Sequence, residues 1–334
     1  KSMMQGSASA VEDLGNQWVH IKVDQKNASQ FSLKSLAQHP DVLYVQPNYK
    51  IHLLTDYRLK DKSARAQLRK LVAQGVVHAT AAADNPPLPT RGSGGSGADP
   101  KFSEQWGMND IGVKQGWQKA NGTGMVVAVI DTGVDYTHED LVDNMWRNPG
   151  ETGTDAQGRD KSSNGIDDDS NGYVDDVIGW DFVSNDNKPF DLAVDPIQLL
   201  MGGGNPGHGT HCAGNVGARS NNGKGVAGVA PDVRIMALRF LSEKGEGDTA
   251  GAVKAINYAV KMGVKVTSNL WGSEGEVPND GTSNQALHDA IENARQHGSL
   301  FIAAAGNGHQ GVGYDNDTDP KPGYPASYKH DNII

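Results

Sequence analysis

The stretch Met125-Val-Val-Ala-Val-Ile-Asp-Thr-Gly133 decides how this chain of 334 residues folds. Its apolar start is typical of a strand that is buried on both faces of a parallel sheet. Further apolar runs predict strands, and apolar residues three or four positions apart predict helices between them. The strands are expected at 233–238, 263–267 and 299–304, and the helices at 249–262 and 283–297. This alternation predicts an α/β fold with a doubly wound parallel sheet.

The first hundred residues follow a different pattern. Apolar stretches at 17–23 and 42–48 predict two strands, with a short helix at 32–39 between them. The highly charged residues 59–75 predict a further helix. These elements indicate a small α+β unit ahead of the α/β body.

The run Asn85-Pro-Pro-Leu-Pro-Thr-Arg-Gly-Ser-Gly-Gly-Ser-Gly97 separates the two parts. Prolines followed by glycines and serines predict a tether that is first extended, then flexible and open to proteolysis. The charge also changes there, because residues 1–98 carry 12 basic and 7 acidic side chains, whereas residues 99–334 carry 18 and 33. Opposite net charges attract each other, which indicates two parts that dock.

Composition excludes several classes of function. The negatively charged body repels nucleic acid and suits bound cations or a basic partner, so no nucleic-acid partner is expected. No apolar run approaches the roughly 20 residues that span a bilayer, so no membrane segment is expected. The single cysteine, Cys212, excludes an internal disulfide framework and a zinc cluster built from cysteines.

Three polar residues occur where an α/β sheet places its functional groups, at the carboxyl ends of strands and the helix starts that follow them. Asp131 ends the first predicted strand. Asn307 lies in Ala303-Ala-Ala-Gly-Asn-Gly308, at the end of another predicted strand. His208 lies in Gly207-His-Gly-Thr-His-Cys-Ala-Gly214, which leads into a helix rich in small residues. Each residue alone fits a turn, a cap or a packing position. Their occurrence together favours a catalytic site.

Two other chemistries deserve comparison. His208 and His211 have the spacing of a metal-binding pair on a helix, but no third ligand follows at a supporting spacing. A dinucleotide site requires Gly-x-Gly-x-x-Gly directly after a strand, and Asp131-Thr-Gly-Val-Asp135 does not provide it. Both alternatives are therefore weaker than the catalytic grouping.

The three polar segments resemble motifs of the subtilisin-like serine proteases, the subtilases, in that family's order. The resemblance covers 99–334 and rests on 127–135 with 138–141, 207–214 and 303–308. It implies a secreted endopeptidase, extracellular or periplasmic, that hydrolyses peptide bonds in protein or peptide substrates. Asp131 would orient His208 and stabilise its imidazolium, and His208 would be the general base and acid. Asn307 would donate a hydrogen bond to the oxyanion of the tetrahedral intermediate.

The resemblance also implies a zymogen. Residues 1–50 resemble the end of the family's inhibitory propeptide, which would act as folding aid and inhibitor. The expected parts are a propeptide domain at 1–55, a charged helix and linker with the processing site at 56–98, and the N-terminal part of the catalytic domain at 99–334.

The family's nucleophilic serine lies in a Gly-Thr-Ser-Met-Ala-x-Pro motif, and this sequence does not contain that motif. The chain reaches Ile334 only 27 residues after Asn307, so we expect the serine on a following segment or a second chain. This chain alone should then be inactive. Gly281-Thr-Ser-Asn284 precedes Asn307, and its Thr282 or Ser283 is expected as the N-cap of the following helix.

Two positions near the site are less clear from the resemblance. Cys212 is expected to be a core residue that points away from the site, not a nucleophile. Leu270 stands where the family commonly has serine before Trp-Gly, so the cleft geometry at that point does not follow from the resemblance.

Asp167-Asp-Asp-Ser-Asn-Gly-Tyr173 resembles the start of an EF-hand-like calcium loop, with oxygen donors at positions 1, 3 and 5 and glycine at 6. Position 12 is Ile178, so Asp175 or Asp176 must replace the usual glutamate. An acidic turn without an ion is the alternative. The expected Ca²⁺ ligands are Asp167, Asp169, Asn171, Tyr173 and Asp176.

A second calcium site is implied by resemblance to one branch of the family, with Asp99, Asp140 and Asn222 as ligands. The N-terminus of the processed domain is a ligand in that branch, so cleavage in the tether would complete this site. Asp181 and Asp186 are possible ligands of a third site.

The sequence as a whole predicts a calcium-stabilised subtilisin-like endopeptidase in its proform. The alternative is a non-catalytic homologue or fragment that binds peptides or a protein partner. Side-chain specificity, the exact cleavage position, the physiological substrate and the oligomeric state do not follow from the sequence.

Overall fold

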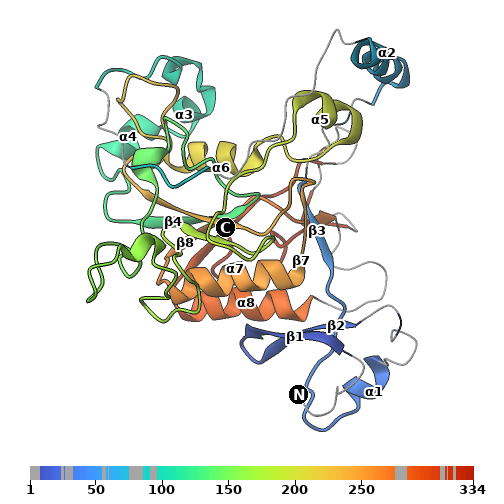
Figure 1. Ribbon diagram of the computed structural model, residues 1–334. Coiled ribbons are helices and arrows are strands. Elements are labelled where there is room, and N and C mark those ends of the chain that lie inside the picture. Colours follow the sequence, from blue (N-terminus) through green and yellow to red (C-terminus); the bar gives the residue numbers. More distant parts are fainter. Residues whose placement is uncertain are drawn as a thin grey trace.

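A five-stranded parallel sheet lies at the centre of the protein (Figure 1). The computed structural model describes residues 8–23, 26, 33–54, 58, 60–74, 86–90, 96–274, 284–308, 313, 315–318 and 321–334. The strands are β4 (Val126–Asp131), β5 (Gly179–Asp181), β6 (Arg234–Arg239), β8 (Val266–Asn269) and β10 (Leu300–Ala303). They stand in the order β10-β8-β4-β6-β5, and every neighbouring pair is parallel. The predicted α/β fold is confirmed.

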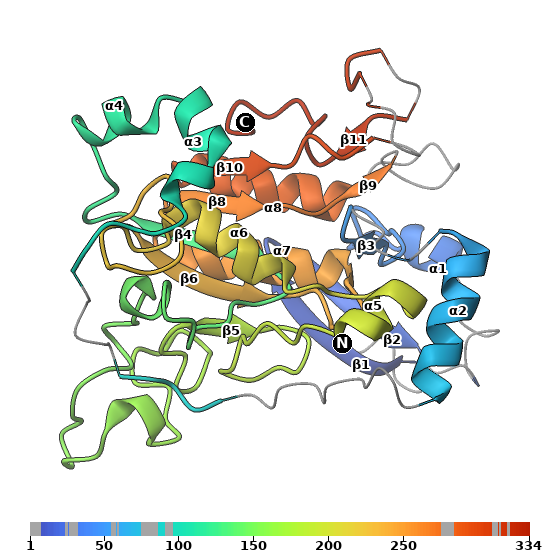
Figure 2. The same ribbon diagram turned by 90° about the horizontal axis from the view of Figure 1, so that it is seen from above.

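Helices cover both faces of this sheet. The main ones are α6 (His208–Gly217), α7 (Thr249–Lys261) and α8 (Gln285–Gln296). Helices α7 and α8 lie side by side on one face, and α6 lies on the other (Figures 1 and 2). On β4, Val127 and Val129 pack in the cluster that contains α6 residues, whereas Ala128 and Ile130 pack in the cluster that contains α7 and α8 residues. Because successive strand residues face opposite sides, both faces of β4 require apolar residues.

The N-terminal part differs in detail from the prediction. It contains β1 (Ala8–Gly15), β2 (Trp18–Val23), α1 (Leu33–Ala37), β3 (Lys50–His52) and α2 (Lys62–Ala73). The strand at 17–23 and the helices at 32–39 and 59–75 are confirmed within a few residues, and β1, the antiparallel partner of β2, was not predicted. The strand expected at 42–48 is wrong.

The reason is that residues 42–48 contact the helices of the body instead of pairing in a sheet. The side-chain oxygen of Gln46 accepts the backbone N–H of Ala286, in the first turn of α8. The side-chain oxygen of Asn48 accepts the N–H of Ala250, in the first turn of α7. Pro47 between them has no N–H to donate to a strand partner. Two helix starts are thereby capped from a distant segment.

The β1–β2 hairpin packs beneath α7 and α8 (Figure 1). Leu14 is 7% exposed and belongs to the same apolar cluster as the buried residues of α7 and α8. At the edges of this contact, Trp18 Nε1 donates to Asp289 at 2.8 Å, and Lys254 Nζ lies 2.7 Å from Glu12. The expectation that the two oppositely charged parts dock agrees with these contacts, although burial of Leu14 adds a force that does not depend on charge.

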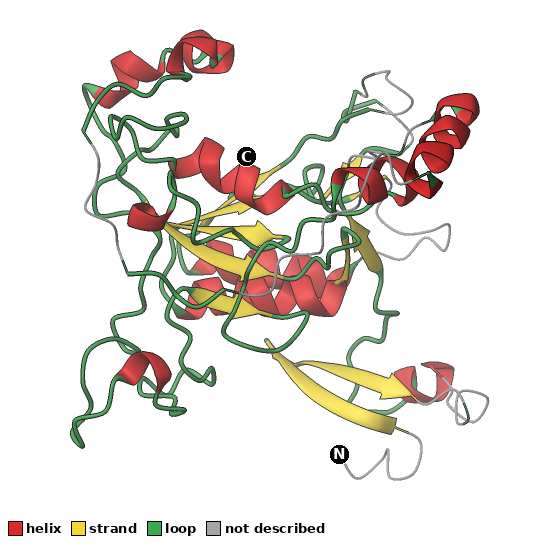
Figure 3. Ribbon diagram, turned by 45° about the horizontal axis from the view of Figure 1, so that its top comes forward, coloured by secondary structure: helices red, strands yellow, loops and turns green. Residues whose placement is uncertain are grey.

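Smaller elements complete the described chain (Figure 3). β7 follows β6 and leads into α7, and β9 pairs with β11. None of the helices in the described residues is long and apolar enough to cross a membrane. The elements are η2 (Phe102–Glu104), α3 (Trp106–Asp110), α4 (Val113–Trp117), η3 (Val142–Asn144), η4 (Lys161–Ser163), α5 (Pro196–Gly202), β7 (Glu246–Asp248), β9 (Ser273–Glu274) and β11 (Gly323–Tyr324).

Two predicted boundaries need correction. The strand expected at 263–267 begins only at Val266, because Gly263, at φ 73°, and Val264 first donate backbone hydrogen bonds that end α7. Helix α8 begins at Gln285, after Asn284, so neither Thr282 nor Ser283 is its N-cap. Both of those residues lie outside the described part of the chain.

The proline-rich half of the tether is docked on the body. Tyr136 donates its hydroxyl to the carbonyl of Pro86 at 2.8 Å, and Arg147 donates to the carbonyl of Pro89. Between them, Leu88 packs against the apolar cluster on the α6 side of the sheet. The glycine-rich residues 91–95, expected to be flexible, lie outside the described residues.

Candidate active site

A buried carboxylate and an imidazole meet at the carboxyl end of β4. Asp131, the last residue of β4, is fully buried, and His208 is the first residue of α6. The two carboxylate oxygens of Asp131 lie 2.8 and 3.0 Å from Nδ1 of His208. The backbone N–H of Thr132 donates to the same carboxylate at 2.7 Å. This arrangement holds the proton on Nδ1 and leaves Nε2 as the basic nitrogen.

Glycines allow the helix to approach the strand this closely. Gly207, at φ 90°, forms the left-handed turn that precedes His208. A Cβ on Gly209 would lie 2.1 Å from the carbonyl oxygen of Gly133, so a larger residue would push the helix away. The N–H of Gly209 instead donates to Oγ1 of Thr132 at 2.9 Å. The small residues of this motif therefore determine the distance between Asp131 and His208.

The surroundings favour a protonated imidazole. Burial disfavours charge on the ring of His208, but the hydrogen bond and charge of Asp131, with the charge of nearby Asp191, outweigh it and raise the pKa of His208 above 6.5. Stabilising the imidazolium is the requirement of a general base that takes up a proton during the reaction.

Cys212 lies directly beside the imidazole. Its Sγ is 3.6 Å from Nδ1 of His208 and the side chain is 3% exposed, so the expectation that it points away from the site is wrong. Helical geometry explains the contact, because residues i and i+4 share a face. Burial, with the charges of Asp131 and Asp191, raises the pKa of the Cys212 thiol. A buried thiol with a raised pKa is a packing residue rather than a nucleophile.

The predicted oxyanion donor lies on the same edge of the sheet. Asn307 is exposed on the loop after β10, four residues beyond the strand end. The strand between β10 and β4 is β8, and its last residue, Asn269, donates through Nδ2 to the carbonyl oxygens of Thr267 and Ile302. The structure thus brings Asp131 and His208 into contact and places Asn307 at the same carboxyl edge.

The segment around β3 crosses this edge. β3 pairs antiparallel with β7, and His52 pairs with Gly272 on its other side. The N–H of His52 donates to the carbonyl of Gly272 at 3.4 Å, and the N–H of Leu53 donates to the carbonyl of Gly245 at 3.0 Å. Since β7 follows β6 and Gly272 follows β8, and β4 lies between β6 and β8, the segment lies over the end of β4. The segment around β3 therefore crosses the carboxyl end of the strand that carries Asp131.

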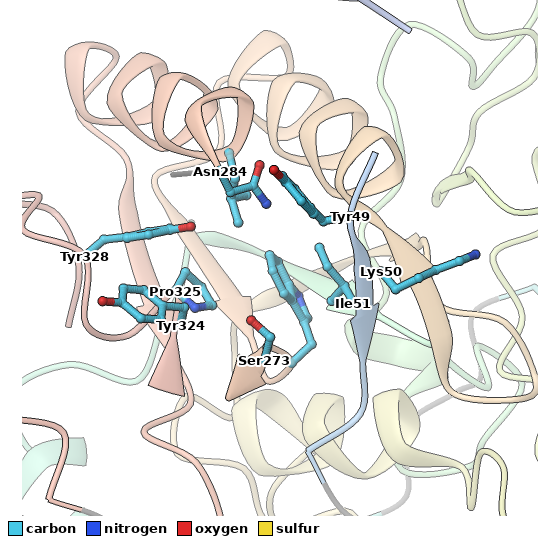
Figure 4. A pocket seen from close by; sticks show the side chains of 11 residues that line it. Tyr49, Lys50, Ile51, Ser273, Asn284, Tyr324, Pro325 and Tyr328 are labelled. Atoms are coloured by element: carbon cyan, nitrogen blue, oxygen red, sulfur yellow. The ribbon is translucent and has the colours of Figure 1, made fainter. Parts of the chain in front are cut away.

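One side chain of this strand is buried in the apolar cluster of the body. Ile51 is 4% exposed, whereas its neighbours Lys50 and His52 are exposed. Figure 4 shows Ile51 at a pocket whose far wall is formed by Tyr324, Pro325 and Tyr328. The pocket itself has a volume of about 20 Å³, which leaves room for roughly one water between Ile51 and this wall.

Leu270, where the resemblance gave no guide, is directed to the opposite face of the sheet. It packs against the apolar cluster that contains Val127 and Val129. Its neighbour Trp271 is fully buried and donates Nε1–H to the carbonyl of Ile130 at 2.8 Å. Leu270 and Trp271 therefore pack the segment after β8 against β4, each on a different face of the sheet.

Three carboxylates converge in the acidic loop. Ligand atoms of Glu151, Asp167 and Asp169 lie within 4.8 Å of one another. Oε1 of Glu151 accepts the backbone N–H groups of Asp168 and Asp169, while Oε2 is buried and has no hydrogen-bond partner among the described residues. Burial and the neighbouring charges of Asp176 and Asp169 raise the pKa of Glu151 to about 6, although its hydrogen bonds oppose the shift. A hard cation such as Ca²⁺ would satisfy these oxygens.

The other expected ligands of this loop have different positions. The Asn171 carboxamide donates to Asp169 and Asp176 and stands between them. Asp176 is fully buried and accepts hydrogen bonds from Asn148, Asn171 and the hydroxyl of Tyr258. The ring of Tyr173 packs edge-on against Trp180 and Tyr258, so only its backbone carbonyl is available as a ligand. Asp176 therefore orients Asn171 through the hydrogen bond between them and does not belong to the group of three carboxylates.

The residues of the second expected calcium site also meet. Nδ2 of Asn222 donates to Oδ1 of Asp140 at 2.7 Å, and the N–H of Val226 donates to the other oxygen. The carboxylate of Asp99 accepts the backbone N–H groups of Asn221 and Asn222.

The possible third site has a different explanation. Asp181 is fully buried, and its Oδ2 lies 2.6 Å from the guanidinium of Arg239, which is itself buried. Its Oδ1 accepts the N–H groups of Val183 and Ser184. The Asp181 carboxylate is therefore engaged in a buried ion pair, and Asp186 pairs with Asp181 only through the backbone.

Sequence reasoning missed two features of these sites. Glu151 lies in Asn148-Pro-Gly-Glu151, outside the loop motif that was recognised, and only its position before an acidic stretch hinted at a role. Ile51 was missed because nothing local marks a single buried residue between exposed ones on a short strand.

Comparisons with known proteins identify the family of this chain. The sequence pattern of the Subtilase family matches residues 122–334. Thermitase from Thermoactinomyces vulgaris is 34% identical over 234 residues, which cover 70% of this chain and 62% of thermitase. A thermophilic serine proteinase from Bacillus sp. (strain AK1) is 31% identical over 231 residues, which cover 69% of this chain and 42% of that protein.

The fold has a counterpart among solved structures. The crystal structure of fervidolysin from Fervidobacterium pennivorans, described as a keratinolytic enzyme related to subtilisin, matches 98% of this chain and 39% of its own, with a TM-score of 0.59 and 23% identity. The chain spans less than two thirds of the length of these relatives. Because the family pattern covers well over half of its residues, this chain belongs to the subtilase family of serine proteases.

Proposed function

We propose that this chain is the pro-region and the first part of the catalytic domain of a calcium-stabilised subtilisin-like serine endopeptidase. The observation that carries the proposal is the contact of 2.8 Å between the buried carboxylate of Asp131 and Nδ1 of His208. Substrates are proteins or peptides, hydrolysed through an acyl-enzyme. We also propose that the protein is secreted, in line with the name of one relative, the minor extracellular protease Epr of Bacillus subtilis (strain 168), which is 27% identical over 320 residues.

In this proposal each residue has a defined role. His208 removes the proton of the nucleophilic serine through Nε2 and returns it to the leaving amine. Asp131 keeps the imidazole oriented and stabilises its charge, which the raised pKa of His208 supports. Asn307, at the same sheet edge, donates to the oxyanion of the tetrahedral intermediate.

The nucleophile is proposed to come from a segment after Ile334 or from a second chain. The 334 residues contain no Gly-Thr-Ser-Met-Ala sequence, and the relatives are longer than the part that this chain matches. On this proposal the chain by itself binds peptides but does not hydrolyse them.

The pro-region is proposed to inhibit the enzyme by occupying its substrate groove. This is supported by β3, which pairs on both edges with the body as an added strand, the usual way in which an extended peptide is bound. Leu54 is the residue that follows the hydrogen-bonded part of this segment, whose last bond is from the N–H of Leu53 to the carbonyl of Gly245. We therefore place the first processing cut after Leu54, which would give a product that begins with Thr55.

Calcium is proposed to bind at Glu151, Asp167 and Asp169, with the Asn171 side chain and the Tyr173 carbonyl completing the shell. The buried, unpartnered Oε2 of Glu151 supports a cation there. The ion would neutralise the loop and stabilise the fold, and would take no part in hydrolysis. Asp99, Asp140 and Asn222 are proposed for a second ion, after cleavage in the tether.

The test uses the protein that includes the family's serine segment. The parent should hydrolyse a denatured protein substrate, and His208→Ala should abolish hydrolysis while circular dichroism stays unchanged. His211→Ala, one turn away and exposed, is the matched control. Retained activity in His208→Ala would exclude the catalytic proposal, and an inactive parent whose body binds peptides would favour the non-catalytic homologue. N-terminal sequencing of the processed protein tests the cut after Leu54.

A further inference from the structure

We propose that Asp191 is a positioning residue for His208, because its buried carboxylate joins the strand that carries Asp131 to the helix that carries the imidazole. The kinetic part of this proposal rests on the proposed function. The structural part can be tested in the chain as it stands.

The carboxylate of Asp191 is 4% exposed and has four donors, all from the two segments that form the catalytic pair or from the turn between them. Oδ1 accepts the hydroxyl of Thr132 at 2.8 Å and Nδ2 of Asn205 at 2.6 Å. Oδ2 accepts the backbone N–H of Thr210 at 2.9 Å and its hydroxyl at 2.6 Å. Thr132 follows Asp131, and Thr210 lies two residues after His208.

The partners of Asp191 pass the constraint on to the histidine. Oδ1 of Asn205 accepts the N–H groups of Gly207 and His208, both at 2.9 Å. Oγ1 of Thr132 accepts the N–H of Gly209. The backbone on either side of His208 is therefore held by groups that Asp191 itself orients.

The charge of Asp191 also has a favourable place. It accepts hydrogen bonds from the first turn of α6, a helix of ten residues, where an anion is stabilised by the unpaired N–H groups. The groups that face His208 are Asp131, Asp191 and the thiol of Cys212. The negative charge of Asp191 contributes to the raised pKa of His208, after the hydrogen bond and charge of Asp131.

Asp191 and Asn205 are also the two ends of one loop. It carries α5 (Pro196–Gly202), which packs near α2 of the pro-region. The hydrogen bond between Asp191 and Asn205 closes the base of this loop, so the same carboxylate that contacts the first turn of α6 also fixes both ends of the loop.

The first test is NMR of His208 in this chain. All four groups around the carboxylate donate, so in Asp191→Asn the new amide faces at least one donor that cannot reverse. We expect a lower pKa for His208 and a displaced or broadened Nδ1–H resonance. Asp195→Asn is the matched control, because Asp195 lies in the same loop but caps only α5.

The second test uses the protein with the serine segment. Asp191→Asn should lower kcat about 10- to 100-fold, as small misplacements of catalytic groups do, with KM changed less than about twofold. If Asp191→Asn does not fold, Thr210→Val, with Thr210→Ser as its conservative partner, replaces it, and only the valine variant should shift the His208 resonance.

The outcomes are distinct. An unchanged resonance and pKa of His208 in folded Asp191→Asn, or in Thr210→Val, would overturn the positioning role. If the parent with the serine segment is inactive but Asp191→Asn still shifts the His208 resonance, the proposed function is contradicted and the positioning role remains supported.

Discussion

Replacing Ile51 with alanine is expected to weaken the docking of β3 between β7 and Gly272. Ile51 is the buried residue of the strand, with 4% of its surface exposed, whereas Lys50 and His52 on either side are exposed. Its side chain belongs to the buried apolar cluster of the body and lines a small pocket opposite Tyr324 and Tyr328. The apolar contact of Ile51 should therefore account for most of the side-chain contribution to docking of β3.

The magnitude follows from the carbon atoms removed. Isoleucine to alanine deletes three buried carbons, and at about 0.8 kcal/mol each the docked state loses roughly 2.4 kcal/mol. Removing these carbons also leaves a cavity, which adds to the loss. The total loss should therefore be at least about 2.4 kcal/mol, within the roughly 2–5 kcal/mol seen for such changes. At 1.36 kcal/mol per factor of ten, docking should weaken by at least about 60-fold.

Hydrogen exchange measures this directly in the unprocessed chain. The amides of His52 and Leu53 donate to the carbonyls of Gly272 and Gly245, so their protection reports how often the strand opens. In Ile51→Ala their protection should fall by the same factor, while amides of β4 remain protected. His52→Ala is the control on the exposed side of the same strand. Equal protection in Ile51→Ala and the control would refute the burial of Ile51 as the source of docking.

Three further predictions follow from other contacts. Calcium at about 100 times its Kd should raise the Tm by roughly 5 °C, and Glu151→Gln should remove most of this rise; no calcium effect on the parent in calorimetry would contradict the loop site. Leu88→Ala should speed proteolysis of the tether about tenfold, because the half-buried leucine holds the proline-rich part on the body, and an unchanged cleavage rate would mean that the two carbonyl hydrogen bonds suffice. The pKa of His208 is raised despite burial, mainly by Asp131, so the pair stabilises the fold fully below pH of about 6.5 and less as the pH rises through the folded-state pKa. Asp131→Asn should accordingly lose more stability at pH 6 than at pH 9 in urea denaturation, and equal losses would speak against the pairing.

The acidic loop shows how far local pattern reaches. Asp167 and Asp169 were predicted from their spacing, because a calcium loop takes ligands from alternate positions of one short segment. Glu151 comes from a separate turn and is brought in only when the loop folds back. Spacing within one segment predicts which of its own residues lie together. It gives no information about which distant carboxylate joins them.

The pro-region shows the same limit. Its helices and one strand follow from local periodicity, but the stretch at 42–48 has strand composition and still forms no strand. The side chains of Gln46 and Asn48 instead accept hydrogen bonds from backbone N–H groups in the first turns of α8 and α7. Such a choice between a strand partner and a helix end depends on which group is within reach.

The sequence by itself determined the α/β class and the parallel sheet, and it predicted that Asp131 and His208 lie together. An apolar run long enough for a two-faced strand, followed by a turn, and glycines around a histidine leave few other folds. Only the tertiary structure decided that Cys212 lies beside the imidazole, that Ile51 is buried against the body, and that Asp191 joins strand to helix. The physical reason is that period and spacing act over one element, whereas burial and hydrogen-bond pairing are settled between elements that meet only in the folded chain.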